Sequence, residues 1–133
     1  MAVSAAGLTF GAPITTGSGA AHVQPNTAAT GDVNSDGILD VVANKSTLNG
    51  SIAIMLGHDD GSGNGDGTFT VSNYDIGSGD IYSLKLADVD NDGKLDIIVA
   101  NNGGQTVRVA QGNGDGTFGA AAVYSILQKC CAH

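Results

Sequence analysis

The sequence predicts an all-β chain made of repeated four-stranded antiparallel sheets. A nine-residue acidic pattern occurs twice, as DVNSDGILD at 32–40 and as DVDNDGKLD at 88–96, offset by 56 residues. Each copy is followed by an apolar run, an alternating run and the hexapeptide NGDGTF, at 64–69 and at 113–118. No segment carries the 3.6-residue apolar stripe of an amphipathic helix.

The segment LTFGAPI at 8–14 resembles the end of each copy. It aligns with GTFTVSN and GTFGAAA, which follow the two acidic patterns. We therefore expect an N-terminal outer strand here, equivalent to the fourth strand of a repeat.

The first copy divides into strand-length pieces. The run Val41–Ala43 is continuously apolar, which predicts a strand buried on both faces. Ile52, Ile54 and Leu56 alternate with other residues, as in a strand with one clear face. TFTVSNYDIG supplies a fourth strand, and the insertion HDDGSG at 58–63 lengthens the loop before it, as repeats tolerate.

The second copy has the same order. Leu84 and Leu86 lead into the acidic pattern, Ile97–Ala100 is continuously apolar, and Val107 alternates with Val109. Four antiparallel strands in about 50 to 60 residues are typical of a β-propeller blade. We expect two blades, at about 8–76 and 77–126, within a domain of 1–126. Residues 127–133 form a tail outside them, either disordered or a boundary artefact.

The composition of the chain limits the classes of function and partner that we expect. The 133 residues are one ordinary domain by length, and 41% hydrophobic residues are enough for a core. A net charge of −8 disfavours nucleic acid as a partner. All 13 acidic residues are Asp, and seven of them lie in the two acidic patterns. Asp suits tight loops, where its oxygens meet a metal ion or local backbone N–H groups.

The acidic pattern predicts a Ca²⁺ site, because Ca²⁺ takes six to eight oxygen ligands and offsets the repulsion of crowded carboxylates. Positions 1, 3, 5 and 9 supply side chains, position 7 a carbonyl, and Gly at position 6 the bend. Mg²⁺ prefers fewer protein ligands, and Zn²⁺ favours His and Cys. The alternative is a turn capped by Asp and Asn without metal. The two expected ligand sets are Asp32, Asn34, Asp36, Asp40 and the Ile38 carbonyl; and Asp88, Asp90, Asp92, Asp96 and the Lys94 carbonyl.

An EF-hand also begins with this spacing, but it needs a carboxylate at position 12 and a following helix. Position 12 is Ala43 in the first copy and Val99 in the second, both inside apolar strand-like runs. The pattern therefore belongs to a β context.

These motifs resemble the FG-GAP/VCBS repeat family of integrin-α-like propellers. The residues that carry the resemblance are the two acidic patterns, both NGDGTF segments and FGAP at 10–13, and it extends to about Ile126. The resemblance implies one calcium ion in the loop between the first and second strands of each blade, and an extracellular or cell-surface binding or adhesion context. It departs from the family in blade number, because such propellers usually have about seven and this chain has two.

Two blades leave sheet faces and edges open. The chain is either a self-associating unit, a fragment of a larger propeller or a small open variant. We expect self-association, with three chains giving a ring of six blades.

The leading functional hypothesis is a calcium-stabilised binding or adhesion module, with a protein or glycan ligand left open. A lectin is the alternative, and a non-catalytic piece of a secreted polysaccharide-active enzyme ranks behind it. No catalytic grouping stands out, so we expect no enzyme. The sequence has no apolar run of membrane-spanning length. Its opening MAVSAAGLTF lacks the basic start and apolar stretch of a signal peptide, so we expect that such a segment was either removed or never part of the given chain. Cys130 and Cys131 are adjacent and cannot close a loop with each other, so their role stays open.

Overall fold

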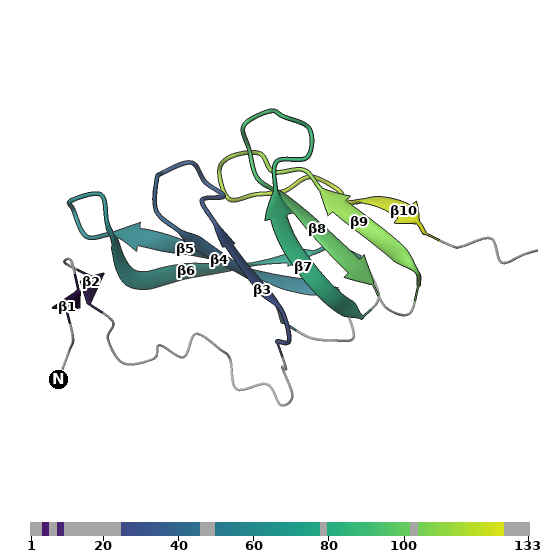
Figure 1. The fold of residues 1–133 in the computed structure, drawn as a ribbon, viewed down its shortest axis with the longest axis horizontal. Helices are drawn as coiled ribbons and strands as arrows, with labels where there is room; N and C mark the ends of the chain where they lie inside the picture. The colour runs from purple at the N-terminus through teal and green to yellow at the C-terminus, as the bar shows by residue number, and fades with distance from the viewer. Residues whose placement is uncertain are drawn as a thin grey trace, which may run out of the picture.

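The computed structural model describes residues 4–5, 8–9, 25–45, 50–77, 80–101 and 104–126, the first two ranges by their backbone alone. All regular structure within these ranges is β-strand (Figure 1). The strands are β1 Ser4–Ala5, β2 Leu8–Thr9, β3 Ala28–Gly31, β4 Asp40–Asn44, β5 Ser51–Asp59, β6 Gly65–Asp75, β7 Ile81–Ala87, β8 Asp96–Asn101, β9 Thr106–Ala110 and β10 Ala122–Ser125.

Two four-stranded antiparallel sheets form, in the orders β3-β4-β5-β6 and β7-β8-β9-β10. Each strand pairs with the next along the chain, so every connection is short and local. This confirms the all-β prediction of two blade-like sheets. The propeller is not closed.

The N-terminal outer strand differs from the expectation. Leu8–Thr9 is a strand, but it pairs with Ser4–Ala5 in a two-stranded sheet of its own and joins neither blade. Closing such a short loop costs little chain entropy. Residues 10–14 of that segment, like Cys130 and Cys131, lie outside the described residues.

The two blades pack through their first strands, β3 beside β7, as Figure 1 shows. A single aliphatic core fills the space between them. Its buried members come from both blades, which is why neither sheet is an independent unit. They are Val33, Val42, Ile52, Ile54, Ile76, Ile81, Leu84, Ile97, Val99 and Ala110.

The expectation that the apolar runs are buried on both faces is wrong for this chain. Val42 is buried, but its neighbours Val41 and Ala43 are only half-buried. In β8 the pattern is inverted, because Ile97 and Val99 are buried and Ile98 is half-buried. Successive side chains in a strand point to opposite faces, and each sheet has a neighbour on one face only.

Polar contacts fix how the blades meet. The Tyr74 hydroxyl donates to the Gly119 carbonyl, and the Tyr74 ring packs on Phe118 with centroids 5.8 Å apart. The Gly116 N–H donates to the Val33 carbonyl at 3.1 Å. Each of these contacts joins the first blade to the second.

The backbone of Gly31 lies close to the second blade. A Cβ built on Gly31 would lie 2.5 Å from the Leu95 Cδ1 atom of the other blade. The first strand of one blade and the acidic loop of the next therefore lie almost in contact.

Candidate metal centre

Both acidic patterns form the loop between the first and second strands of their blade, β3–β4 and β7–β8. Figure 1 shows the two loops at the same end of the molecule. This placement agrees with the sequence-based expectation for each blade.

The loops share one backbone conformation. Position 4 is left-handed in each, with φ of 63° at Ser35 and 64° at Asn91. Position 6 is also left-handed, with φ of 85° at Gly37 and 83° at Gly93. Only glycine adopts this region without steric cost, and Asn tolerates it better than most residues. Glycine at position 6 therefore permits the sharp curl of both loops.

In the first loop, the acidic side chains accept hydrogen bonds from the loop's own backbone. Asp32 accepts the N–H groups of Asp36 at 3.1 Å and Gly37 at 2.8 Å. Asp36 accepts the Ile38 N–H at 2.8 Å. The Asn34 amide accepts the Asp36 N–H through its oxygen and donates to the Asp36 carboxylate at 2.9 Å. The side chain at position 3 is thus turned onto position 5.

The second loop repeats this pattern with one change. Asp88 accepts the Asp92 and Gly93 N–H groups at 3.1 and 2.8 Å, and Asp92 accepts the Lys94 N–H at 2.9 Å. Position 3 is now the carboxylate of Asp90. It accepts the Asp92 N–H at 3.2 Å and, through its other oxygen, the side-chain amide of Gln111 at 2.8 Å.

The carboxylate at position 9 is buried in both loops and ties the loop to the next hairpin. Asp40 accepts the Val33 N–H and the Gly57 N–H, each at 2.8 Å. Asp96 accepts the Val89 and Gly112 N–H groups, each at 2.9 Å. A buried carboxylate is tolerated because each oxygen has a donor. The predicted ligand at position 9 therefore also has a structural role that the spacing did not reveal.

Three carboxylates of the second loop converge. One oxygen from each of Asp88, Asp90 and Asp96 lies within 4.8 Å of the other two. Ligand atoms on opposite sides of one Ca²⁺ are about 4.6–5.2 Å apart, because each lies about 2.3–2.6 Å from the ion. The residues therefore fit a single calcium ion in donor type and in spacing.

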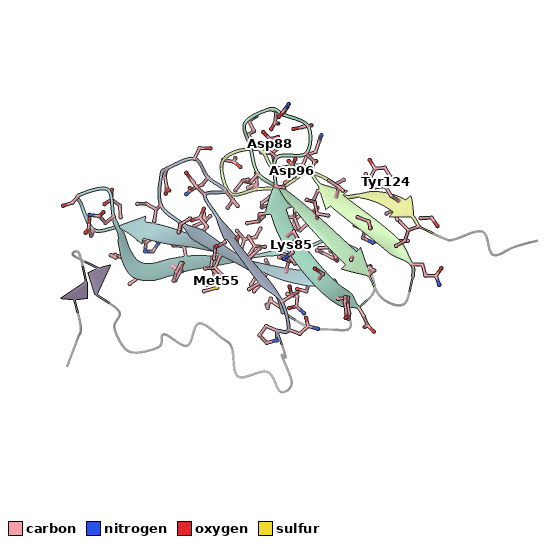
Figure 2. All side chains as sticks on the ribbon, viewed as in Figure 1. Met55, Lys85, Asp88, Asp96 and Tyr124 are labelled. Atoms are coloured by element: carbon pink, nitrogen blue, oxygen red, sulfur yellow. The ribbon has the colours of Figure 1, made fainter. Side chains whose placement is uncertain are left out.

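Figure 2 shows Asp88 and Asp96 close together in the second loop, where β7 ends and β8 begins. Asp92 is not part of the converging group; one of its oxygens accepts the Lys94 N–H. Within the described residues, the first loop forms no comparable group of acidic side chains, since its position 3 is Asn34. The carbonyls of Ile38 and Lys94 stay predicted ligands.

In the second loop, the pKa values of Asp88 and Asp90 shift in opposite directions. The Gly93 N–H is the largest cause that lowers the pKa of Asp88 below its ordinary value. Desolvation in the crowded loop raises the pKa of Asp90, and the negative charges of Asp92 and Asp96 raise it further. A bound dication would relieve that repulsion.

Other acidic residues serve turns. Asp59 accepts the N–H groups of Gly61 and Gly63, and Asp60 accepts that of Ser62. These bonds stabilise the β5–β6 loop, which is the insertion noted in the sequence. His58 lies between the hydroxyls of Thr68 and Thr70, at 2.7 and 2.6 Å.

Three contributors to the loops were missed by sequence reasoning: Gly57, Gly112 and Gln111. Gly57 and Gly112 lie 17 and 16 residues after the position-9 aspartates; Gly57 directly follows its alternating run, and Gly112 is separated from its own by Gln111 alone. That shared spacing was a usable signal. Nothing in the sequence marks Gln111.

The described residues contain no helix long and apolar enough to cross a membrane. Searches of curated proteins and of solved structures found no significant match. The family model described as "FG-GAP-like repeat" matches residues 32–99 and again residues 88–129. The starts of the two matches coincide with the two acidic loops and have the same offset of 56 residues. The matches cover most of the chain, and with its two blade-like sheets the chain belongs to the FG-GAP-like repeat family.

Proposed function

We propose that the chain is a calcium-stabilised module for extracellular binding or adhesion, with one Ca²⁺ in each acidic loop. The observation that carries the proposal is the convergence of Asp88, Asp90 and Asp96 within 4.8 Å at the junction of β7 and β8. The first loop shares the backbone curl and the buried position-9 carboxylate, and supports a second, weaker site.

Calcium acts here as a structural ion. It would hold the loop between the first two strands of a blade and offset the repulsion among the carboxylates. Extracellular calcium modules bind with dissociation constants of about 10⁻⁴ to 10⁻³ M. Millimolar calcium then contributes about 0.4–1.4 kcal/mol per site to the free energy of unfolding. Sites of this affinity would be filled at the millimolar calcium found outside the cell, where we place the module.

The binding partner is proposed as a protein surface. Carbohydrate sites commonly use aromatic platforms, and the chain has no Trp and only six aromatic residues. A glycan array tests the lectin alternative: binding of a defined sugar class would replace adhesion to protein as the proposed activity.

The calcium proposal is tested by thermal and urea unfolding in 1 mM CaCl₂ and in EDTA, with Mg²⁺ as the competing ion. We expect Ca²⁺ to stabilise the chain and Mg²⁺ to do so less. Asp90→Ala should remove most of the calcium-dependent gain. Asp80→Ala is the matched control, because Asp80 is exposed just before β7 and the change in charge is the same. Identical unfolding curves in calcium and EDTA would contradict the proposal.

A further inference from the structure

The strand registers show which residues of the two blades are equivalent. Residues on the face of the first sheet that the second blade covers have their equivalents on the uncovered face of the second sheet. Val42 pairs with Ile54 in the first sheet, and Ile98 pairs with Val109 at the same place in the second. Val42 and Ile54 are buried against the second blade. Ile98 and Val109 lie on the face of the second sheet that nothing described covers, and they are half-buried. The second blade therefore offers the same kind of face that the first one buries.

Two strongly exposed apolar residues of the second blade also have equivalents in the first blade that are buried. Val33 and Val89 both occupy position 2 of the acidic pattern, yet Val33 is 2% exposed and Val89 is 53% exposed. Ile76 directly follows β6 and Ile126 directly follows β10, and their exposures are 1% and 60%. In each pair, the first-blade residue is covered by the second blade, and the second-blade residue lacks such a cover.

Tyr74 and Tyr124 are also equivalent in register, and again only the first-blade residue is covered. Tyr74 pairs with Ile52 in the first sheet, and Tyr124 pairs with Val107 at the equivalent place in the second. Tyr74 packs on Phe118 of the next blade, whereas Tyr124 is 57% exposed. Figure 2 shows Tyr124 on β10, at the outer side of the second sheet.

The uncovered face of the first sheet carries the equivalents of the second-blade residues that pack on the first blade. Leu39 and Leu95 both occupy position 8 of the acidic pattern; Leu95 packs against the shared core, and Leu39 is 67% exposed. Phe69 bridges to Gly57 as Phe118 bridges to Gly112, so Phe69 is the equivalent of the ring on which Tyr74 packs.

We propose that a second copy of this chain docks head to tail, with the first-blade face of one copy on the second-blade face of the next. The contact would repeat the interface already present between the two blades. The first-blade face consists of Leu39, Val41, Met55, Phe69 and Val71; the second-blade face consists of Val89, Ile98, Val109, Tyr124 and Ile126.

The match is not complete at two positions. Lys85 pairs with Ile98 where the covered face has Ala29 paired with Val42. A lysine can lay its alkyl chain along an apolar surface and keep its ammonium group in water. Gln111 stands where the covered face has Leu56, and its amide bonds Asp90 instead. The second-blade face is therefore a weaker copy of the covered one.

Head-to-tail contacts are heterologous, so they close into a ring when the rotation per copy permits and otherwise continue as a filament. Propellers close with about four to eight blades. Two-blade chains reach that range with two to four copies, and three copies give six blades.

The test is mass in solution by light scattering and analytical ultracentrifugation. The wild-type chain should assemble to a multiple of 13.1 kDa, with three copies expected. Val71→Asp on one face and Tyr124→Asp on the other should each give a folded monomer, because both side chains are exposed in the single chain but buried on docking. Burial of an unpaired carboxylate should weaken association at least about 100-fold.

Mixing the two variants gives the decisive result. Val71→Asp retains an intact second-blade face, and Tyr124→Asp retains an intact first-blade face. Their mixture should form a 1:1 dimer that grows no further. Self-association of either variant alone would indicate a symmetric contact and overturn the proposal. So would a folded wild-type monomer at high concentration, which would point to further repeats of a longer chain as the occupant.

Two controls keep the test independent of folding defects. Val123→Asp lies next to Tyr124 on β10, is similarly exposed at 51%, and points to the opposite face, so it should assemble like the wild type. Met55→Asp and Ile98→Asp form a second complementary pair if either first variant loses its circular-dichroism spectrum.

Discussion

The two acidic loops have the same backbone conformation but not the same number of carboxylates. Both curl through left-handed residues at positions 4 and 6, and both bury the aspartate at position 9. They differ at position 3, where Asn34 donates to its neighbour Asp36 and Asp90 adds a third converging carboxylate. The loop conformation is thus independent of the number of carboxylates, whereas the number of carboxylates determines how well the loop suits an ion.

The largest effect should come from the feature that the loops share. Asp40→Ala removes the acceptor of two N–H groups and leaves both donors buried, which costs about 3 kcal/mol of unfolding free energy. Asp96→Ala should cost slightly less, because its bond to Val89 is only partly buried. Urea unfolding in EDTA measures both values. A loss below about 1 kcal/mol for either variant would show that the loops are not tied to their hairpins in this way.

A medium effect should follow from exchanging position 3. Asn34→Asp should raise calcium affinity in the first loop about tenfold, and Asp90→Asn should lower it in the second by a similar factor. Isothermal titration calorimetry on each single variant and on the double exchange measures the two constants. Equal calcium affinities in the two wild-type loops, unchanged by either substitution, would show that the residue at position 3 does not determine calcium affinity.

The smallest effect concerns pH. Hydrogen bonds from Thr68 and Thr117 lower the pKa of Asp66 and Asp115 below the ordinary 3.8. A depressed folded-state pKa contributes stability that is present above the unfolded pKa and is lost as pH falls through the folded value. Thr68→Val and Thr117→Val should therefore flatten the fall in stability below about pH 4.

The matched variants Thr68→Val and Thr117→Val should behave alike, because both NGDGTF segments make the same contact. Urea unfolding between pH 2.5 and 6 measures this. A steeper fall in either variant than in the wild type would contradict the assignment.

Most of the fold could be predicted from the sequence, because the repeat makes each signal appear twice. The position of each acidic loop between two strands followed from the apolar runs after Asp40 and Asp96. The exclusion of an EF-hand was also correct, because Ala43 and Val99, which would have to be ligands in a loop before a helix, both lie in strands.

The hydrogen bonds between the loops and residues outside the nine-residue pattern were not predicted. The donors at Gly57 and Gly112 come from the hairpin that follows each loop, and Gln111 reaches Asp90 from the end of β9. Sequence spacing within nine residues gives no information on groups that arrive from 16 to 21 residues away.

The sequence by itself determined the local chemistry: strands from apolar periodicity, the curl from glycine at position 6, and oxygen donors from Asp and Asn. Only the tertiary structure decided which face of each strand is buried, because that depends on which side a neighbouring sheet occupies. Val42 and Ile98 are equivalent in sequence, yet one is buried and the other half-buried. Burial belongs to the packing of two sheets, and a strand's own sequence specifies only that one face can be covered.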